Sequence, residues 1–252
     1  MTDYNYLGLV NNINRRLNEV ELTSTNFSTA VGWYSQCQDA VNAAIRDINQ
    51  QQYEWPFNHV EQTDTLVAGT TRYPIPSDSK LIDFDSFRIK EDATIGNDTI
   101  RLGVATYEDY LKRRVDQEYT TSTTKRGLPK FVFQAPSLEY GVTPAPDASY
   151  ELVYEYYCLP VDLELFSDVP SIPEQFRYVV VDGAMYHAYL FRGNSQDASI
   201  AYQKFQSGIK SMRSILINRF VYVTSGMVSR SSITGSSLGS AFATAGSVSD
   251  GF

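Results

Sequence analysis

Side chains that commonly act as catalytic bases, nucleophiles or metal ligands at neutral pH are scarce in this chain. Its 252 residues include two histidines, His59 and His187, and two cysteines, Cys37 and Cys158, which lie far apart in the sequence. This spacing matches neither the clustered ligands of a zinc site nor a disulfide framework. We therefore expect both cysteines to be buried free thiols in a reducing compartment, and we expect no metal and no cofactor.

Catalytic motifs are also missing, since no Gly-x-Ser-x-Gly, His-Glu-x-x-His or P-loop pattern occurs. His187 lies in an apolar helical pattern, which predicts a hydrogen-bonded core or interface residue. Acidic pairs could serve glycoside hydrolysis at a defined separation of the carboxyl groups, but an outward-facing polar strand predicts the same residues. These pairs are Asp83 and Asp85, Glu151 and Glu155, and Asp162 and Glu164. We predict that the protein is not an enzyme.

Long hydrophobic runs are absent. No stretch approaches the roughly eighteen apolar residues that a membrane span needs. The first five residues form neither a basic leader nor an apolar one. We expect a protein that is made in a cytoplasm and has no membrane partner.

Positive charge is in deficit, because the formal net charge is -8 and the sequence pI is about 4.8. Proteins that bind nucleic acid usually carry a basic patch on their surface. Here basic residues gather only at 112–114 and 125–126, where we expect a solvated helix face and loop. A net-acidic surface suits a protein that DNA passes without binding, although solubility alone accounts for it equally well.

What the chain does contain begins with two apolar stripes at helical spacing near the N-terminus. The first consists of Tyr6, Leu9, Val10, Ile13 and Leu17. The second consists of Phe27, Val31, Tyr34, Cys37, Gln38, Val41, Ala44, Ile45 and Ile48. We expect two helices, the second ending at Trp55-Pro56-Phe57 because proline disfavours helical geometry in the residue before it.

A second pair of helices is predicted near the other end. Ser171 and Glu174 have the spacing of a capping box with Pro173 in the first turn, so a helix should begin there. It is apolar around most of its circumference as far as Leu190, and Gly193-Asn194 supplies the stop. The next helix carries Ala198, Ala201, Tyr202, Phe205, Ile209, Met212, Ile215 and Leu216 at helical spacing. The two should form an antiparallel hairpin that buries Phe176, Val180, Tyr202, Phe205 and Ile209.

Between the helical pairs the patterns are those of strands. We predict strands at 63–67, 69–75, 81–89, 99–102, 130–133 and 150–156. The first two should flank a turn, with the prolines beside Tyr73 confining their strand to a sheet edge. Thr106–Asp109 should cap one embedded helix. We interpret this region as a small β-sandwich or barrel with a helix at its side.

These patterns together predict an α+β fold. The two N-terminal and two C-terminal helices should form a four-helix bundle-like domain, because their apolar stripes must be buried against one another. The β-sandwich or barrel is inserted between them, and an extended C-terminal tail follows. The predicted boundaries are 1–57 and 166–219 for the two parts of the helical domain, 58–165 for the insert and 220–252 for the tail.

The tail has an unusual composition. Residues 224–252 are about two-thirds Ser, Gly, Ala and Thr, and only Arg230 and Asp250 are charged. Large apolar residues recur in it, unlike in a plain flexible linker. They are Val228, Ile233, Leu238, Phe242, Val248 and Phe252. We interpret the segment as a tail with apolar anchors, the alternative being a disordered C-terminus.

Several phrases of this sequence resemble the head-to-tail adaptor proteins of short-tailed phages, also called tail tubular protein A or portal-adaptor proteins. They are Tyr154-Glu155-Tyr156-Tyr157-Cys158-Leu159-Pro160, Pro170-Ser171-Ile172-Pro173-Glu174-Gln175-Phe176-Arg177-Tyr178-Val179-Val180, the strand-turn-strand phrase at 66–78, and Trp55-Pro56-Phe57. The likeness covers residues 20 to 220 and is one of layout and short phrases. The chain departs from shorter members in its larger β insert and in its Ser/Gly/Ala tail.

The resemblance implies a structural virion protein that forms a ring of about twelve copies below the portal. It also implies β domains that face the tail tube, nozzle or fibres, a C-terminal extension that reaches the portal protein, and a central channel through which DNA passes without specific binding. The alternative is a tail-associated carbohydrate or peptidoglycan hydrolase, or a carbohydrate-binding tail module.

Two groups of residues are therefore candidate contact sites. Portal docking is expected from Phe220, Tyr222, Val228, Arg230, Ile233, Leu238, Phe242 and Phe252. Subunit contacts or core packing are expected from Phe176, Tyr178, Val180, Tyr186 and Phe205. The second group follows from a helix that is apolar on nearly all sides, since neighbouring copies in a ring could bury what one copy cannot.

Overall fold

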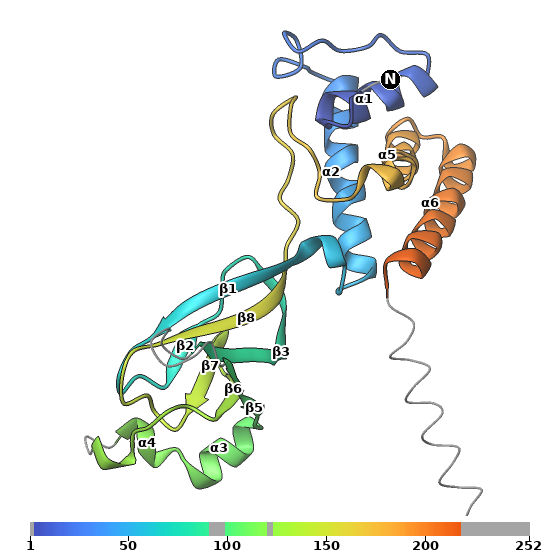
Figure 1. The fold of residues 1–252 in the computed structure, drawn as a ribbon. Helices are drawn as coiled ribbons and strands as arrows, with labels where there is room; N and C mark the ends of the chain where they lie inside the picture. Colours follow the sequence, from blue (N-terminus) through green and yellow to red (C-terminus); the bar gives the residue numbers. More distant parts are fainter. Residues whose placement is uncertain (1–2, 91–98, 120–122, 218–252) are drawn as a thin grey trace, which may run out of the picture. The chain divides into compact units, whose positions relative to one another are not determined.

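The computed structural model describes residues 3–90, 99–119 and 123–217 (Figure 1). The fold is α+β, with helices at both ends of this range and two four-stranded sheets between them. The chain divides into two units after Met212, near the end of the final helix.

The two N-terminal helices form where the apolar stripes predict them, with one correction. The Asn5 side chain caps α1 (Tyr6–Arg16) by accepting a hydrogen bond from the Gly8 amide at 2.8 Å. Helix α2 (Trp33–Gln51) begins later than its stripe suggests, because Gly32 takes a positive φ of 64° directly before it. Val31 therefore lies outside the helix and is 78% exposed. A short 3₁₀ turn, η1 (Pro56–Asn58), follows α2.

The predicted capping box at Ser171 and Glu174 does not form. A 3₁₀ turn, η3 (Glu174–Phe176), leads into α5 (Arg177–Phe191), and neither start carries a side-chain cap. The first turn starts at Glu174 with Pro173 at its N-cap, so Ser171 lies before the helix start, and its hydroxyl donates to Asn58 Oδ1 at 3.2 Å. Glu174 pairs with Arg177 at 3.2 Å.

The predicted stop after α5 is confirmed. Gly193 takes a φ of 74°, and its amide donates to the Leu190 carbonyl at 3.0 Å. The Asn194 amide donates to the Tyr189 carbonyl at 3.0 Å, which completes a Schellman motif. Helix α6 (Ser195–Leu216) then begins, with Asn194 Oδ1 accepting from the Asp197 amide at 3.2 Å.

The helices contact one another through small residues. Helix α5 lies against α1 and α2, so the N-terminal and C-terminal pairs touch, as predicted. A Cβ on Gly183 of α5 would come within 2.7 Å of the Phe205 ring of α6 and 3.0 Å of Ala44 in α2. Likewise, a Cβ on Gly208 would approach Val179 to 3.0 Å. Glycine at these two positions lets α5 and α6 pack closely.

The first sheet has the order β1-β8-β3-β4, and all its pairs are antiparallel. Its strands are β1 (His59–Leu66), β3 (Ser79–Lys90), β4 (Thr99–Arg101) and β8 (Tyr150–Cys158). Strands β1 and β8 pair without interruption from His59 opposite Tyr157 to Leu66 opposite Tyr150. Strand β3 is longer and bulged, with register shifts on both sides of its pairing at 81–83.

The second sheet has the order β2-β7-β6-β5. Its strands are β2 (Arg72–Pro74), β5 (Gly103–Val104), β6 (Phe131–Ala135) and β7 (Glu139–Thr143). Strand β2 lies at an edge, as its prolines predict, but it does not form a hairpin with β1, which belongs to the other sheet. Strand β7 was not predicted because Gly141 interrupts its apolar pattern, yet the glycine is needed there, since a Cβ would collide with the Phe133 ring.

The core of the β region is aromatic. Phe87 stacks on Tyr154 with ring centroids 4.6 Å apart, and Tyr140 of the second sheet meets Phe87 edge-on at 5.3 Å. Helix α3 (Tyr107–Arg113) is capped by Thr106, as predicted, and packs Tyr110 on Phe133 at 4.0 Å. Two short turns follow it, α4 (Asp116–Tyr119) and η2 (Thr123–Lys125).

Candidate interaction surfaces

A lysine of the first sheet caps the C-terminal end of α2. Lys80 of β3 donates from Nζ to the Asn49 carbonyl and, at 3.1 Å, to the Gln52 carbonyl. Its ammonium also lies 5.0 Å from the centroid of the Tyr53 ring. A cation at a helix C-terminus is favourable because the last carbonyls have no partner within the helix. Desolvation lowers the pKa of Lys80 in this position.

Side-chain amides extend this junction to the C-terminal helices. Asn58 Nδ2 donates to Asn49 Oδ1, while Asn58 Oδ1 accepts from the Ser171 hydroxyl. Trp55 is fully buried, and its Nε1 donates to the Ile48 carbonyl at 2.9 Å. The exit from α2, the start of β1 and the approach to α5 are therefore held at one point.

A half-buried carboxylate, that of Asp64, links the two sheets. The hydroxyls of Tyr140 in β7 and Tyr154 in β8 both donate to Asp64 Oδ2, at 2.8 and 2.9 Å. Gln62 Nε2 donates to the other carboxylate oxygen at 3.0 Å. Burial, followed by the contact with Asp64, raises the pKa of both tyrosines. The aspartate satisfies hydroxyls that the aromatic core would otherwise leave unpaired.

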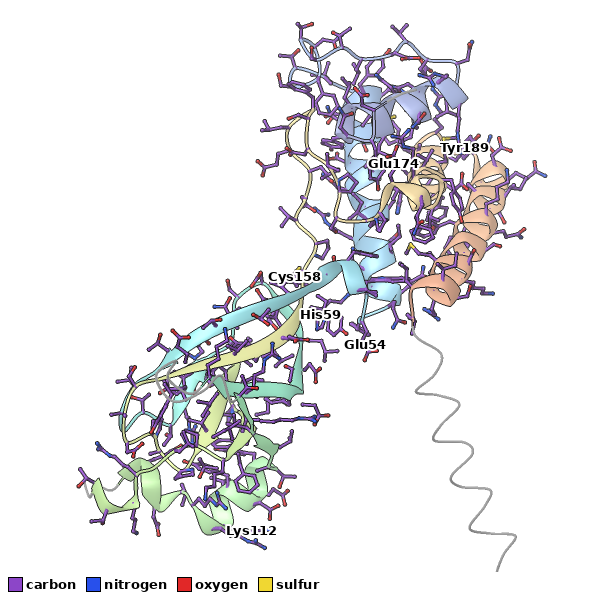
Figure 2. All side chains as sticks on the ribbon, viewed as in Figure 1. Glu54, His59, Lys112, Cys158, Glu174 and Tyr189 are labelled. Carbon is purple, nitrogen blue, oxygen red and sulfur yellow. The ribbon has the colours of Figure 1, made fainter. Side chains whose placement is uncertain are left out.

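Both histidines contact a carboxylate, and one member of each acidic pair contacts a basic side chain. His187 Nε2 lies 2.9 Å from Asp47 Oδ2, which confirms the predicted hydrogen-bonded role. His59 lies 3.2 Å from Glu155, which also pairs with Arg88 at 3.0 Å (Figure 2). In the other pairs, Asp162 pairs with Arg46 and Asp85 pairs with Arg101. These contacts support the interpretation of the acidic pairs as polar surface.

The two cysteines differ in their surroundings. Cys37 is buried in α2, as predicted, and burial raises the pKa of its thiol to about 12. Cys158 is half-buried, so the prediction of full burial is wrong for it, because it lies at the very end of β8. Among the residues that the structure describes, no group of three or more His, Cys, Asp and Glu side chains is arranged to hold a metal.

The basic residues that the sequence groups together belong to α3 and the loop after it. Lys112 is exposed and lies 3.6 Å from Glu108 one turn earlier (Figure 2). The Arg114 guanidinium stacks over the Phe131 ring at 4.8 Å, and that of Arg126 lies against Gly69. This arrangement supports the predicted solvated face and does not concentrate the cations into one patch.

Helix α5 is the centre of the helical region. Phe176, Val180, Phe205 and Ile209 are buried, as their spacing predicts. Tyr202 is 44% exposed, so the prediction of its burial is wrong. It lies at the border of the α6 stripe, where its ring meets Tyr186 at 5.1 Å. Tyr178 is exposed as well, which leaves it and Tyr186 as the members of the predicted contact group that lie toward the surface.

A hollow of about 180 Å³ lies where the end of α1 meets α5 and α6. Tyr189 of α5 is one of its lining residues and is labelled in Figure 2. Arg16 and Asp182 pair across it at 2.6 Å. The other lining residues are Met185, Asp197, Ile200, Ala201 and Lys204.

The segment 159–169, between β8 and α5, is a second surface that the sequence did not predict. Leu163 is buried, and its backbone N–H and C=O both pair with the Asn42 side chain of α2 at 3.0 Å. The amides of Tyr6 and Leu7 in α1 donate to the carbonyls of Asp168 and Phe166. Although it is fixed in this way, the segment exposes large apolar side chains. They are Leu159, Val161 at 85%, Leu165 at 63%, Phe166 and Val169.

A second hollow, of about 450 Å³, lies beside α3 in the β region. It is lined by Phe84, Val104, Ala105, Thr106, Tyr107, Gln134, Ala135 and Pro136. This lining holds no carboxyl group, so it offers neither of the two acids that glycoside hydrolysis uses.

The predicted portal-docking residues, Phe220 to Phe252, lie outside the described residues, as does the apolar run at 220–223. None of the helices within residues 3–90, 99–119 and 123–217 combines the length and apolar character that crossing a bilayer requires.

The family model described as SU10 adaptor protein matches residues 4–226, which include every helix and strand described above. No curated protein matches the chain.

Proposed function

The chain belongs to the SU10 adaptor protein family, and from this premise we propose how it performs its structural role as an adaptor in a phage particle. In this proposal, copies of the chain form a closed ring below the portal protein, extend the channel for DNA, and carry the attachment site for the tail tube, nozzle or fibres. The single observation that carries it is the family match, which extends over both helical pairs and the β region.

The described surface supports a role in assembly. Monomeric proteins rarely expose contiguous apolar patches, and larger patches usually mark contacts with other proteins. In this chain the 159–169 segment exposes five large apolar side chains while its backbone is held against α1 and α2. A fixed and exposed apolar segment is suited to binding another protein with little further loss of conformational entropy.

We place the ring contacts in a helical domain and the tail contacts in the β region. The helical domain is the four-helix bundle of α1, α2, α5 and α6, from residues 1–57 and 166–219, and the β region at 58–165 is its insert. Tyr178 and Tyr186 of α5 are the subunit-contact residues, whereas Phe176, Val180 and Phe205 support them from the core. The ring has about twelve copies, in keeping with the preference of homo-oligomers for closed symmetry.

The C-terminal tail, residues 220–252, is the proposed portal-docking element. Its large apolar residues, from Phe220 and Tyr222 to Phe242 and Phe252, are separated by small residues that fit a narrow groove. Ordering so many residues opposes the binding of a single tail. Several tails in one ring act together through their high effective concentration.

The tail proposal is tested by truncation. A chain that ends at Val223 should keep its fold, measured by circular dichroism, but should no longer co-sediment with isolated portal, whereas the full chain should do so. The matched control replaces Asp250, which is outside the predicted docking residues, with serine and keeps Arg230 and the apolar anchors, so it should bind. Equal binding of the truncated and full chains would show that the tail is not the docking element.

A further inference from the structure

We propose that the 159–169 segment of one copy binds the hollow between α1, α5 and α6 of the neighbouring copy. The contact between subunits would then run head to tail, with Glu164 next to Lys204 and Leu165 next to Ile200. This inference rests on the proposed ring and deepens it by naming two surfaces that meet in addition to Tyr178 and Tyr186, one of them the segment that joins the β region to the helical domain.

Each of the two surfaces carries one charged side chain without an ion pair in the described part of the chain, and the two charges are opposite in sign. The 159–169 segment contains three acidic residues, Asp162, Glu164 and Asp168, and no basic one. Asp162 pairs with Arg46, and Asp168 accepts from the amides of Glu164 and Leu165 at 2.8 and 2.7 Å. The Glu164 carboxylate is exposed and has no ion pair within the described part of the chain.

The hollow is lined by two cations, Arg16 and Lys204, and by two carboxylates, Asp182 and Asp197. Its two carboxylates are engaged, because Asp182 pairs with Arg16 and Asp197 accepts from Asn194 Nδ2 at 2.6 Å. Lys204 is exposed at its rim and forms no ion pair with any residue that the structure describes. An incoming carboxylate such as Glu164 would therefore find a free cation there. Complementary charges of this kind fix the register of a protein contact.

The apolar parts of the two surfaces also correspond. Ile200 lies one turn before Lys204 on the same side of α6 and is 52% exposed. Leu165 directly follows Glu164 and is similarly exposed. A contact that joins Glu164 to Lys204 can therefore bury Leu165 against Ile200, which removes two exposed apolar side chains from water.

One chain can use both surfaces at the same time. The 159–169 segment contacts the first residues of α1, Tyr6 and Leu7, whereas the hollow lies at its last residue, Arg16. Ten residues of α-helix separate these ends by about 15 Å. In Figure 1 the segment runs on one side of α2, and α5 and α6 lie on the other. Two different, separate surfaces that bind each other produce a heterologous contact, which closes into a ring when the rotation allows it.

Disulfide trapping tests this contact even where the association is weak. In a Cys158→Ser background, which leaves only the buried Cys37, Leu165→Cys and Ile200→Cys are introduced together. Mild oxidation of the concentrated protein should give a ladder of cross-linked oligomers. Either cysteine alone should give no species larger than a dimer, because a ladder requires two different reactive surfaces on each copy.

The matched control pairs Leu165→Cys with Leu138→Cys, which is on the β region and is more exposed than Ile200. It should give no ladder. Adding Lys204→Glu to the trapping variant should lower the yield of trimers and larger species about tenfold, and Glu164→Lys should then restore it. Absence of a ladder, or a ladder of equal strength from the Leu138 control, would overturn the inference.

The result is separable from that of the proposed ring. If electron microscopy shows rings of the wild-type chain on portal while trapping gives no ladder, the ring stands and these two surfaces are not its contact. If no ring is seen under any condition, the proposed function fails.

Discussion

At the scale of single residues, the packing of α5 against α6 depends on one aromatic side chain. Phe205 is 1% exposed, and its ring occupies the space that the absent side chain of Gly183 leaves free. The Phe205→Ala change should lower the free energy of unfolding by about 3–5 kcal/mol, because the variant loses the buried apolar surface of the ring and leaves a cavity in its place. Chemical denaturation measures this. Tyr202→Ala, on the exposed border of the same helix, is the control and should cost much less.

A loss below about 1 kcal/mol for Phe205→Ala would mean that the site collapses around the smaller residue or that the stripe of α6 is not core.

Because its core contains buried tyrosines, the protein should become less stable at alkaline pH. Burial and the nearby Asp78 raise the pKa of Tyr156 to about 12, and the pKa values of Tyr140 and Tyr154 are raised as well. The folded chain therefore holds protons that the unfolded chain releases near pH 10. The stabilisation is present below pH 10 and should be lost as the pH rises towards 12.

The measurement is the free energy of unfolding at several pH values from about 8 to 12, with tyrosinate absorbance recorded in parallel. Tyr140→Phe should reduce the slope, whereas Tyr53→Phe, at an exposed position, should not. A free energy that stays level across this range would contradict the account of the aromatic core.

Residue spacing predicted most of the helical core but not its border. Phe176, Val180 and Ile209 are buried because they recur along one side of a helix, and this spacing can be recognised in the sequence. Tyr202 has the same spacing, yet it lies where the stripe ends, and only the position of α5 decides which border residue is covered. The Asp64–Tyr140–Tyr154 network could not be predicted, because its members come from three strands whose pairing the sequence does not state.

At the scale of elements, the last carbonyl groups of α2 receive hydrogen bonds from a residue of another element. Lys80 of β3 supplies the cap that the helix does not encode locally, since no basic residue lies in its last turn. Lys80→Met should expose these carbonyls and speed hydrogen exchange of the amides at 49–53 about tenfold or more, while the rest of α2 changes little.

Lys90→Met, at the far end of the same strand, is the matched control and should leave exchange in α2 unchanged. Unaltered exchange at 49–53 in the Lys80 variant would show that Trp55 and Asn58 hold the junction without the lysine.

Element types were predicted better than element starts and partners. The stop of α5 and the cap of α3 were predicted because glycine and threonine act locally there. The capping box at Ser171 failed because the first turn starts later than predicted, at Glu174 with Pro173 at its N-cap. Strand β7 was missed because its Gly141 serves a cross-strand neighbour, Phe133, that the local pattern does not reveal.

At the scale of the whole molecule, the proposed ring would multiply the net charge of -8 that each copy carries. DNA should therefore pass the assembled protein without being held, since phosphate binding requires clustered cations. Fluorescence anisotropy with a labelled duplex at physiological salt should detect no tight binding. Tight binding with a steep dependence on salt would contradict the charge argument.

The fold class and the adaptor family could be inferred from the sequence because its residue patterns give the order of the helices, the strands and the tail. The 159–169 surface could not. Its apolar residues alternate with acidic ones in the pattern of a buried strand, but only Leu163 is covered. Burial of one residue and exposure of its neighbours depend on where α1 and α2 meet the segment.

The central claim is that this chain is an adaptor that assembles as a ring on the portal. It is tested most directly by electron microscopy of isolated portal mixed with the purified full-length protein, followed by averaging of the particle images. The account predicts a closed ring of additional density on one face of the portal, with its central channel left open. Portal particles that remain bare at saturating protein, or single copies bound without forming a ring, would contradict it.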